Sequence, residues 1–287
     1  MQASTALSDL SEKIETASAG VLSTRRGDQW REGSARLLRE HFLLSCQTLT
    51  PALLLELGAH AAETSVAFLD RVGGQAIAFE ANPYTFAAKT RGAVSVGVDV
   101  RNSAVAAEVG QAVLHIPQRG GSRSLTPGSA SLLRRVEGVE YTSVSVPATT
   151  IDAIVDGLDI SGGVALWVDV EGLGYEVLRG GLDLLQRDEC RIVMVEVEDV
   201  QLWEAQSTGV AIDQLMASLD FVPIMRDAEY ESQYNVVYVK ASQRGRVDPA
   251  AYWAALAGIR TSNTRWAYRR TRAALRSVAR RTLRRHQ

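Results

Sequence analysis

Residues 52–58 read Ala-Leu-Leu-Leu-Glu-Leu-Gly, a nearly continuous apolar run that ends in a glycine. A run of this kind is typical of a strand that is buried on both faces of a parallel sheet. The glycine lets the chain turn sharply into a helix, which the pattern indicates over residues 63–72. The stretch therefore predicts the first strand, turn and helix of an α/β fold.

Similar short apolar runs recur along the chain. They cover residues 76–79, 94–98, 164–168, 192–197 and 235–239. Most are separated by stretches that suit helices, such as residues 175–185. Alternating strands and helices predict right-handed crossovers and an open, doubly wound, mostly parallel sheet with helices on both faces. Ligands of such sheets bind outside the carboxyl ends of the strands.

The composition of the chain changes at three places. Residues 1–50 are expected to form a helical lead-in, and residues 51–245 the sheet domain. Within that domain, residues 111–146 break the rhythm, because a Ser- and Gly-rich loop separates two short β-like pieces. We expect this insertion to cover the carboxyl edge of the sheet as a lid. Residues 246–287 form an Ala-, Trp- and Arg-rich tail with a helical pattern.

The charge of the chain is divided unevenly. In total, 31 basic and 33 acidic side chains nearly balance, but residues 260–287 hold ten arginines and no acid. Residues 1–259 therefore keep 21 basic and 33 acidic groups, a net charge of −12. Such a body argues against a protein that wraps nucleic acid, because that binding needs a broad positive surface. The tail suits an anionic lipid surface or an acidic partner, and a solvated helix explains it equally well.

The cysteine content and the apolar segments bear on location. Cys46 and Cys190 lie far apart, so neither a disulfide framework nor a Cys-ligated zinc site is expected. The first residues lack an apolar signal-peptide core, and no run of about 18 apolar residues occurs. We expect a cytoplasmic protein, with any peripheral contact at the inner membrane surface made through the tail.

The first chemical motif is the turn at Gly58. Backbone N–H groups at a helix start are unpaired and can meet a ligand there. Glu80 ends the second strand, 22 residues beyond Gly58, where an acid can accept both hydroxyls of a ribose. A pyrophosphate needs more glycines, whereas a cationic cofactor such as S-adenosylmethionine tolerates Glu56 beside the turn. The alternative is a plain turn and a solvated strand end.

The second motif is an acid pair after the fourth strand. Asp169 and Glu171 lie two residues apart and are expected to point to the same side. Such a pair can act as a general base and an orienting group, or it can share a divalent cation. The alternative is that Asp169 caps the next helix and that Glu171 is exposed.

Taken together in this order, the motifs resemble the FkbM family of S-adenosylmethionine-dependent methyltransferases. The resemblance covers roughly residues 53–240. Its pieces are Leu-Glu-Leu-Gly-Ala-His (55–60), Ala-Phe-Glu-Ala-Asn-Pro (78–83), Gly-Ser-Ala-Ser-Leu (128–132), Val-Pro-Ala-Thr-Thr-Ile-Asp (146–152), Val-Asp-Val-Glu-Gly-Leu-Gly-Tyr-Glu-Val-Leu-Arg-Gly (168–180), Val-Glu-Val-Glu (195–198) and Asn-Val-Val-Tyr (235–238).

The resemblance implies a class I methyltransferase fold, which is Rossmann-like, with seven strands and one antiparallel edge strand. It also implies O-methylation of a hydroxyl on a sugar, a glycan or a natural-product scaffold. By position in the family's motifs, the residues expected to bind S-adenosylmethionine are Glu56, Gly58 and Ala59 at the methionine part, Glu80 and Asn82 at the ribose, and Asp99 or Asn102 near the adenine. Asp169 and Glu171 would face the methyl acceptor.

The chain departs from the family at two motifs. The family's first motif usually reads Asp-Val-Gly-Ala-Asn-x-Gly, whereas here His60 stands for Asn and Ala62 for the second Gly. In the fourth-strand motif the family often has Lys two residues before the Asp, and this chain has Trp167. A Trp there can stack on a sugar ring or pack in the core, and packing is the more common role.

Our mechanistic hypothesis makes Asp169 the general base and Glu171 the orienting group, with His60 as the second choice for the base. Assistance by a divalent metal ion held by Asp169, Glu171 and Glu196 is an open alternative, but no His or Asn ligand is clearly supplied, and we assign no metal site. Two rival functions stay open. One is a non-catalytic cofactor-binding or scaffold protein that docks through its basic tail. The other is a nucleic-acid methyltransferase recruited by that tail, although the acidic body offers no basic channel and no Asn-Pro-Pro-Tyr-like motif occurs.

Overall fold

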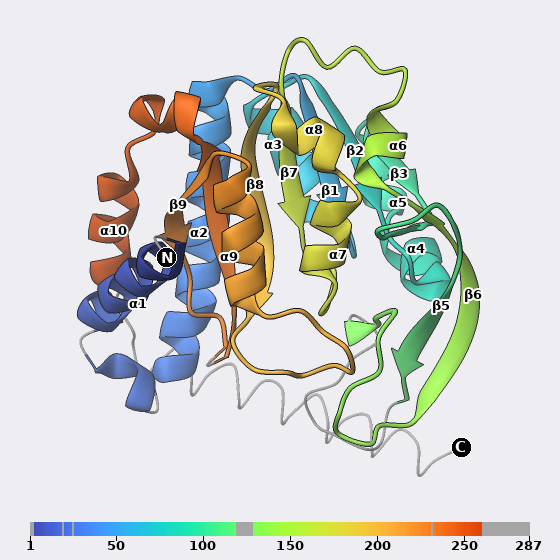
Figure 1. Cartoon of the computed structure of the whole chain (residues 1–287), viewed down its shortest axis with the longest axis horizontal. Helices are drawn as coiled ribbons and strands as arrows, with labels where there is room; N and C mark the ends of the chain where they lie inside the picture. The colour runs from blue at the N-terminus through green and yellow to red at the C-terminus, as the bar shows by residue number, and fades with distance from the viewer. Residues whose placement is uncertain (1–2, 19, 25, 119–128, 231, 260–287) are drawn as a thin grey trace, which may run out of the picture.

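A central sheet with helices on both faces forms the body of the molecule (Figure 1). The computed structural model describes residues 3–18, 20–24, 26–118, 129–230 and 232–259. In the order in which they lie side by side, the seven strands are β3 (Asp99–Arg101), β2 (Gln75–Phe79), β1 (Leu53–Leu57), β7 (Val164–Val168), β8 (Cys190–Glu198), β10 (Gln233–Lys240) and β9 (Phe221–Arg226). The expected doubly wound, mostly parallel, seven-stranded sheet with helices on both faces is confirmed.

The direction of the strands corrects one expectation. β1 pairs in parallel with β2 and β7, and β7 with β8, whereas β10 is antiparallel to both of its neighbours. The antiparallel strand is therefore β10, inside the sheet, and the edge strand is β9. The sequence patterns did not predict β9, which contains Pro223; an edge strand tolerates Pro because it needs fewer backbone donors.

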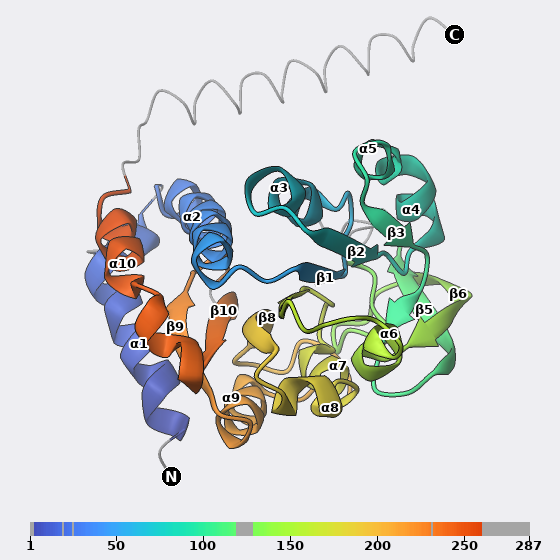
Figure 2. The ribbon, with the colours of Figure 1, turned by 90° about the horizontal axis from the view of Figure 1, so that it is seen from above.

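Two layers of helices cover the sheet. On one face, α2 (Gly27–Leu49), α3 (Glu63–Arg71) and α10 (Pro249–Ala257) bury side chains against those of β1, β7 and β8. On the other face lie α6 (Ile151–Val155), α7 (Gly174–Arg179), α8 (Leu182–Gln186) and α9 (Gly209–Ser218). Figure 2 shows α1 (Ala3–Ser18) beside α10 and β9, so the N-terminal helix covers the sheet edge. None of the helices in the described ranges is both long and apolar enough to cross a membrane.

Two predicted elements differ from the structure. Residues 94–98 were expected as the third strand, but α5 (Arg91–Ser95) and a turn occupy them, and β3 begins only at Asp99. The reason is burial: Val94 and Val96 are exposed, so the apolar run never enters the sheet. The helix expected over residues 175–185 is divided into α7 and α8, and Gly180 and Gly181 separate them.

The insertion forms a second, small sheet together with β4 (Ala104–Val105), which lies just before it in the chain. β4, β6 (Tyr141–Thr149) and β5 (Gly110–Pro117) lie in that order, and they surround a separate apolar cluster that includes Leu114, Ile116 and Val146. The two β-like pieces of the insertion thus pair as β5 and β6. The loop between them at residues 119–128, and the Arg-rich segment 260–287, lie outside the described residues.

Candidate active site

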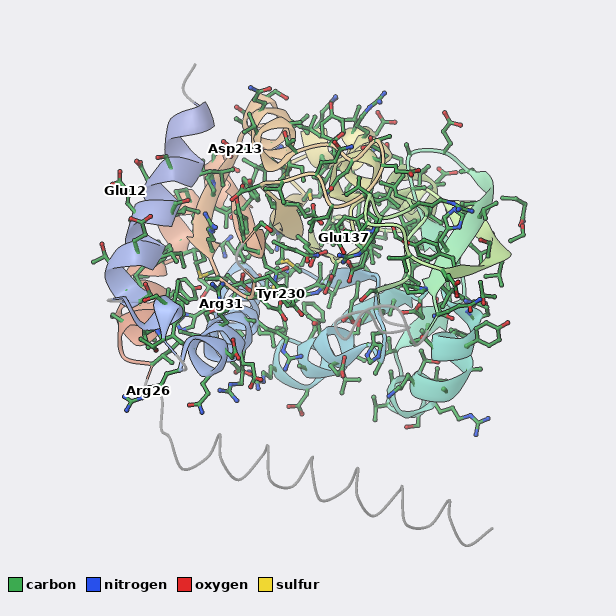
Figure 3. The ribbon with its side chains drawn as sticks, turned by 90° about the horizontal axis from the view of Figure 1, so that it is seen from below. Glu12, Arg26, Arg31, Glu137, Asp213 and Tyr230 are labelled. Carbon is green, nitrogen blue, oxygen red and sulfur yellow. The ribbon has the colours of Figure 1, made fainter. Side chains whose placement is uncertain are left out.

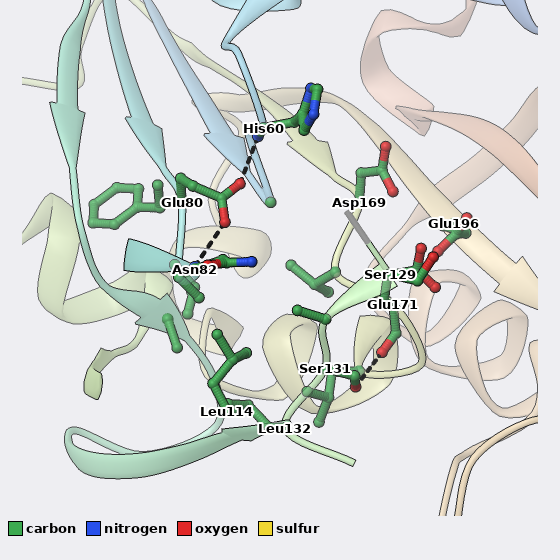
Figure 4. Close-up of a pocket in the computed structure, with 18 of the residues that line it drawn as sticks. His60, Glu80, Asn82, Leu114, Ser129, Ser131, Leu132, Asp169, Glu171 and Glu196 are labelled. Atoms are coloured by element: carbon green, nitrogen blue, oxygen red, sulfur yellow. Dashed lines mark hydrogen bonds between the residues drawn. The ribbon is translucent and has the colours of Figure 1, made fainter. Parts of the chain in front are cut away.

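A cleft of about 480 Å³ opens at the carboxyl ends of β1, β2, β7 and β8. It lies where the strand order reverses between β1 and β7, the usual ligand position in such sheets. Residues 129–132 of the insertion line its outer side. In Figure 4, Glu80 and Asn82 lie on one side of this cleft, and Asp169, Glu171 and Glu196 lie on the other.

The turn after β1 lies in close contact with the turn after β7. Gly58 has a φ of 84°, and a Cβ at its position would lie 1.7 Å from the carbonyl oxygen of Asp169. Its N–H donates to the carbonyl of Phe79 (3.0 Å), as does the N–H of Ala59 (2.8 Å). Only glycine permits this approach, so Gly58 sets the distance between two walls of the cleft.

The two departures from the family's first motif share an unusual backbone. His60 has a φ of 51° and Ala62 a φ of 57°. These left-handed values suit the Asn and Gly that the family usually has there, and they cost other residues about 1–2 kcal/mol each. His60 and Ala62 therefore hold a backbone conformation that is unfavourable for their own residue types. His60 lines the cleft, as expected of a site residue.

Glu80 connects the turns after β1 and β2 through hydrogen bonds. Its Oε2 accepts from the N–H of His60 and its Oε1 from the N–H of Asn82, both at 2.7 Å (Figure 4). Burial raises the pKa of Glu80, and these two hydrogen bonds oppose that shift. Asn82 begins α4 (Pro83–Lys89), because its Oδ1 accepts from the N–H groups of Tyr84 and Thr85. The structure thus places Glu80 and Asn82 in the cleft wall.

Glu56 does not line the cleft, which corrects the position expected for it. It is almost fully buried, and its carboxylate accepts from the N–H groups of Thr64 (3.2 Å) and Ser65 (2.8 Å) at the start of α3. Burial raises the pKa of Glu56 to about 7. The neighbouring Ala59 is buried in the core as well. Glu56 therefore supports the turn from below by holding the first residues of α3.

Replacing Glu56 by Gln is expected to lower stability. The amide of Gln can accept only through its oxygen, so its NH₂ group would face a backbone N–H, at a cost of about 1–3 kcal/mol. Chemical denaturation measures this loss, and calorimetry of S-adenosylhomocysteine binding should show little change for the folded variant. Glu63→Gln is the matched control in the same helix turn; Glu63 is exposed, so we expect a change within about 0.5 kcal/mol. Equal effects of both substitutions would contradict the supporting role.

Asp99 is also displaced from its expected position. It was expected after the third strand, beside the adenine, but β3 begins with it. Its side chain is exposed and forms an ion pair with Arg101 at 2.7 Å. Asn102 does follow β3, and its Nδ2 donates to the carbonyl of Glu80 (2.7 Å). Asn102 therefore supports the end of β2, while Asp99 lies two residues before the carboxyl edge.

The predicted acid pair is brought together in the cleft. Asp169 and Glu171 both line it and both are partly exposed. Burial, and next the charge of Glu171, raise the pKa of Asp169 well above its usual range. Burial also raises the pKa of Glu171 to about 7, although Arg135, 4.0 Å away, opposes the shift. The two acids therefore share one environment that disfavours charge on both.

The insertion contacts this acid pair directly. The hydroxyl of Ser131 donates to the carbonyl of Glu171 (2.6 Å), and the guanidinium of Arg135 lies 4.5 Å from the ring centre of Trp203. Glu171 itself has a φ of 27°, an uncommon value for a residue with a side chain. Such strain persists where surrounding contacts hold the backbone, as Ser131 does here.

The cleft is also lined by Glu196, Glu229 and Tyr230, which are not among the predicted catalytic or cofactor-binding residues. Glu196 lies on β8 in the Val-Glu-Val-Glu motif, and its position in a buried strand was the available signal. Glu229 and Tyr230 come from the loop between β9 and β10. No signal in the sequence pointed to these two, because β9 itself was not predicted. Among the residues that the structure describes, no group of three or more His, Cys, Asp or Glu side chains is arranged to hold a metal ion.

Trp167 packs in the core. It is buried, and its ring meets that of Phe42 edge to face, with the ring centres 5.1 Å apart. It does not line the cleft, so the packing role expected for it is confirmed.

Comparison with known proteins finds a matching family and several similar solved structures. Residues 56–223 match the family described as the methyltransferase FkbM domain. No curated protein matches the chain. A similar solved structure is precorrin-6y C5,15-methyltransferase of Geobacter metallireducens GS-15, with 11% identity, 70% of this chain and 86% of that chain covered, and a TM-score of 0.35. A second is magnesium protoporphyrin IX methyltransferase of Synechocystis PCC 6803 with bound SAM, with 10% identity, 75% of this chain and 80% of that chain covered, and a TM-score of 0.39. A third is 1,6-didemethyltoxoflavin-N1-methyltransferase of Burkholderia thailandensis, with 15% identity, 78% of this chain and 87% of that chain covered, and a TM-score of 0.36.

Proposed function

The chain belongs to the FkbM family of S-adenosylmethionine-dependent methyltransferases, and on this premise we propose that it methylates a hydroxyl of a sugar, a glycan or a natural-product small molecule. The observation that carries the proposal is the convergence of the Gly58 turn, Glu80 and Asp169 on one cleft from three neighbouring strands. We call the side of the cleft that is formed by Gly58 and Glu80 the cofactor half, and the side that begins at Asp169 the acceptor half.

The residues of the cofactor half fit S-adenosylmethionine. Each oxygen of Glu80 accepts one backbone N–H, and an ionised carboxylate has lone pairs left for two ribose hydroxyls. The close turn at Gly58 lets backbone groups approach a ligand without an intervening side chain. The acidic lining of the cleft suits a positively charged molecule. S-adenosylmethionine supplies, when bound, a methyl group on a positively charged sulfur, and transfer of that group leaves a neutral thioether.

The acceptor half begins at Asp169. When the acceptor oxygen gains the methyl group it must lose its proton, and the carboxylate of Asp169 takes it. The raised pKa of Asp169 makes its carboxylate a stronger base than an exposed one. Glu171 orients the acceptor from the same turn. Holding the acceptor in line is the other main contribution that the cleft walls make to the rate.

The function is tested by methyl transfer from S-adenosylmethionine with a trideuterated methyl group. The purified full chain is incubated with this cofactor and a pooled extract of sugars and small natural products, and mass spectrometry detects labelled products. Resistance of the product to N-demethylating chemistry and its NMR spectrum identify an O-methyl group. Binding of the cofactor without any labelled product would favour the non-catalytic alternative, and a labelled nitrogen or carbon would contradict O-methylation.

A further inference from the structure

The acceptor half of the cleft contains more acid than the transfer of one proton requires. Glu171 follows β7, Glu196 lies on β8, and Glu229 precedes β10, so these three carboxylates lie beyond Asp169 when viewed from Glu80 on the β2 side. Figure 4 shows Glu171 and Glu196 on the side of the cleft opposite Glu80, and the charge of Glu171 acts on Glu196. Transfer of one proton from a neutral hydroxyl to one general base leaves these three further carboxyl groups without a role in that step.

Glu196 is the key residue of this group. It is 8% exposed and lines the cleft, yet its Oε2 has no hydrogen-bond partner among the described residues. The Oε2 of Glu171 makes no hydrogen bond either, although the Nη2 of Arg135 lies 4.0 Å from it. A buried polar atom without a partner costs about 1–3 kcal/mol, so folded proteins keep few of them. The Oε2 of Glu196 on the cleft wall therefore suits a hydrogen-bond donor of a bound ligand.

The surroundings of Glu196 indicate that the donor is positively charged. Burial and the charges of Asp169, Glu171 and Glu198 all raise the pKa of Glu196, and a hydrogen bond from Gln233 opposes them. The guanidinium of Arg135 is 4.0 Å from Glu171 and stacks on Trp203 at the insertion side. A cation bound between Glu171 and Glu196 would stabilise both carboxylates in their charged form.

An organic ammonium fits this arrangement better than a metal ion. Divalent ions need several ligands around one centre, and no group of three or more suitable side chains in the described ranges is so arranged. An ammonium group directs three N–H donors to separate acceptors and does not need such a shell. Tyr230, 56% exposed, also lines the cleft and lies near the middle of the face on which the strands end (Figure 3). An aromatic ring beside acidic groups favours the binding of a cation.

We propose that the methyl acceptor carries a protonated amine next to the hydroxyl that is methylated, and that Glu196 and Glu171 bind this ammonium. The proposal rests on the methyltransferase function and narrows the acceptor to amino alcohols such as amino sugars. Glu196 acts as a specificity residue, because it recognises the acceptor and does not take part in the transfer of the methyl group.

The test compares two probes that differ only in charge. Full-length protein saturated with S-adenosylhomocysteine is titrated with trans-2-aminocyclohexanol and with trans-1,2-cyclohexanediol, and NMR line shifts give the dissociation constants. We expect the amine to bind about tenfold tighter or more, the effect of a charge-assisted hydrogen bond. In Glu196→Gln the ratio should fall to about one, with a similar fall in Glu171→Gln. Glu108→Gln is the matched control, because Glu108 is exposed and does not line the cleft.

Separate readouts distinguish this proposal from the proposed function. S-adenosylhomocysteine binding is measured first for the wild-type chain and for each variant. Failure of the wild-type chain to bind it would count against the methyltransferase function. With that binding intact, equal affinity for both probes would overturn the ammonium site. So would a preference for the amine that persists in both Glu→Gln variants. Competition of the amine by Mg²⁺ at equal strength in wild type, lost in Glu196→Gln, would replace the ammonium by a metal ion.

Discussion

Replacing Gly58 by Ala is expected to lower the free energy of unfolding by about 3–5 kcal/mol and to abolish cofactor binding. Two costs add up. The φ of 84° is unfavourable for Ala by about 1–2 kcal/mol, and the added Cβ would lie 1.7 Å from the carbonyl oxygen of Asp169. Backbone must move to relieve that contact, because the facing atom is itself backbone. The whole stability of a typical domain is about 5–15 kcal/mol, so the loss is large.

Gly73 provides the matched control for this substitution. It has the same φ of 84°, but no atom lies within 4 Å of the position that its Cβ would take. Gly73→Ala should therefore show the cost of the backbone conformation alone, about 1–2 kcal/mol. Urea denaturation of both variants separates the two contributions, and calorimetry with S-adenosylhomocysteine measures binding. If Gly58→Ala costs no more than Gly73→Ala, the close contact of the two turns is not important for stability.

The second large effect is expected for Asp169→Asn. Removing a general base lowers kcat by about 10²–10⁴-fold, while binding of S-adenosylhomocysteine should stay nearly unchanged. Single-turnover rates with an acceptor identified by the labelling experiment measure this loss. Asp213→Asn serves as the control, because Asp213 is a buried acid on α9 that does not line the cleft. A rate for Asp169→Asn within about threefold of wild type would exclude Asp169 as the base.

The pH profile gives an independent readout of the same assignment. A base acts only when it is deprotonated, so the rate should rise with pH through the pKa of Asp169. Burial and Glu171 raise that pKa, so the rise should occur at a higher pH than for an exposed Asp, whose pKa is about 3.9. His60→Asn should leave this limb of the profile in place. If the rise of the rate with pH is instead absent in His60→Asn, then His60 is the base.

Strands buried on both faces were the elements that the sequence predicted best. β1, β7 and β8 are continuous apolar runs because helices cover each of their faces. The same rule failed at residues 94–98, where the apolar run remains at the surface in α5 and a turn. It also missed β9, whose Pro223 weakens the strand pattern although an edge position accepts it. A local pattern reports apolarity, and only packing decides whether that apolarity is buried.

The candidate site shows the same limit for charged residues. The sequence identified Gly58, Glu80, Asn82, His60, Asp169 and Glu171, and the structure places all six at one cleft. Glu56 failed as a cleft residue because it shares with Leu54 the strand face that points toward α2 and α3. Glu229 and Tyr230 join the cleft only because β10 returns antiparallel between β8 and β9. Spacing along a strand does not say which face a carboxylate will use when both faces are buried.

The order of apolar runs and the turn glycine thus determined the α/β architecture, because strand burial and the conformational freedom of glycine are properties of short segments. Which acids meet was decided by tertiary structure. Asp169 and Glu171 follow β7, Glu196 lies within β8, and Glu229 lies between β9 and β10. Burial raises the pKa of each, and neighbouring carboxylates add to the shift, which for Glu229 is the charge of Asp227. Both causes depend on distances between segments far apart in the chain, and these distances exist only after the sheet has formed.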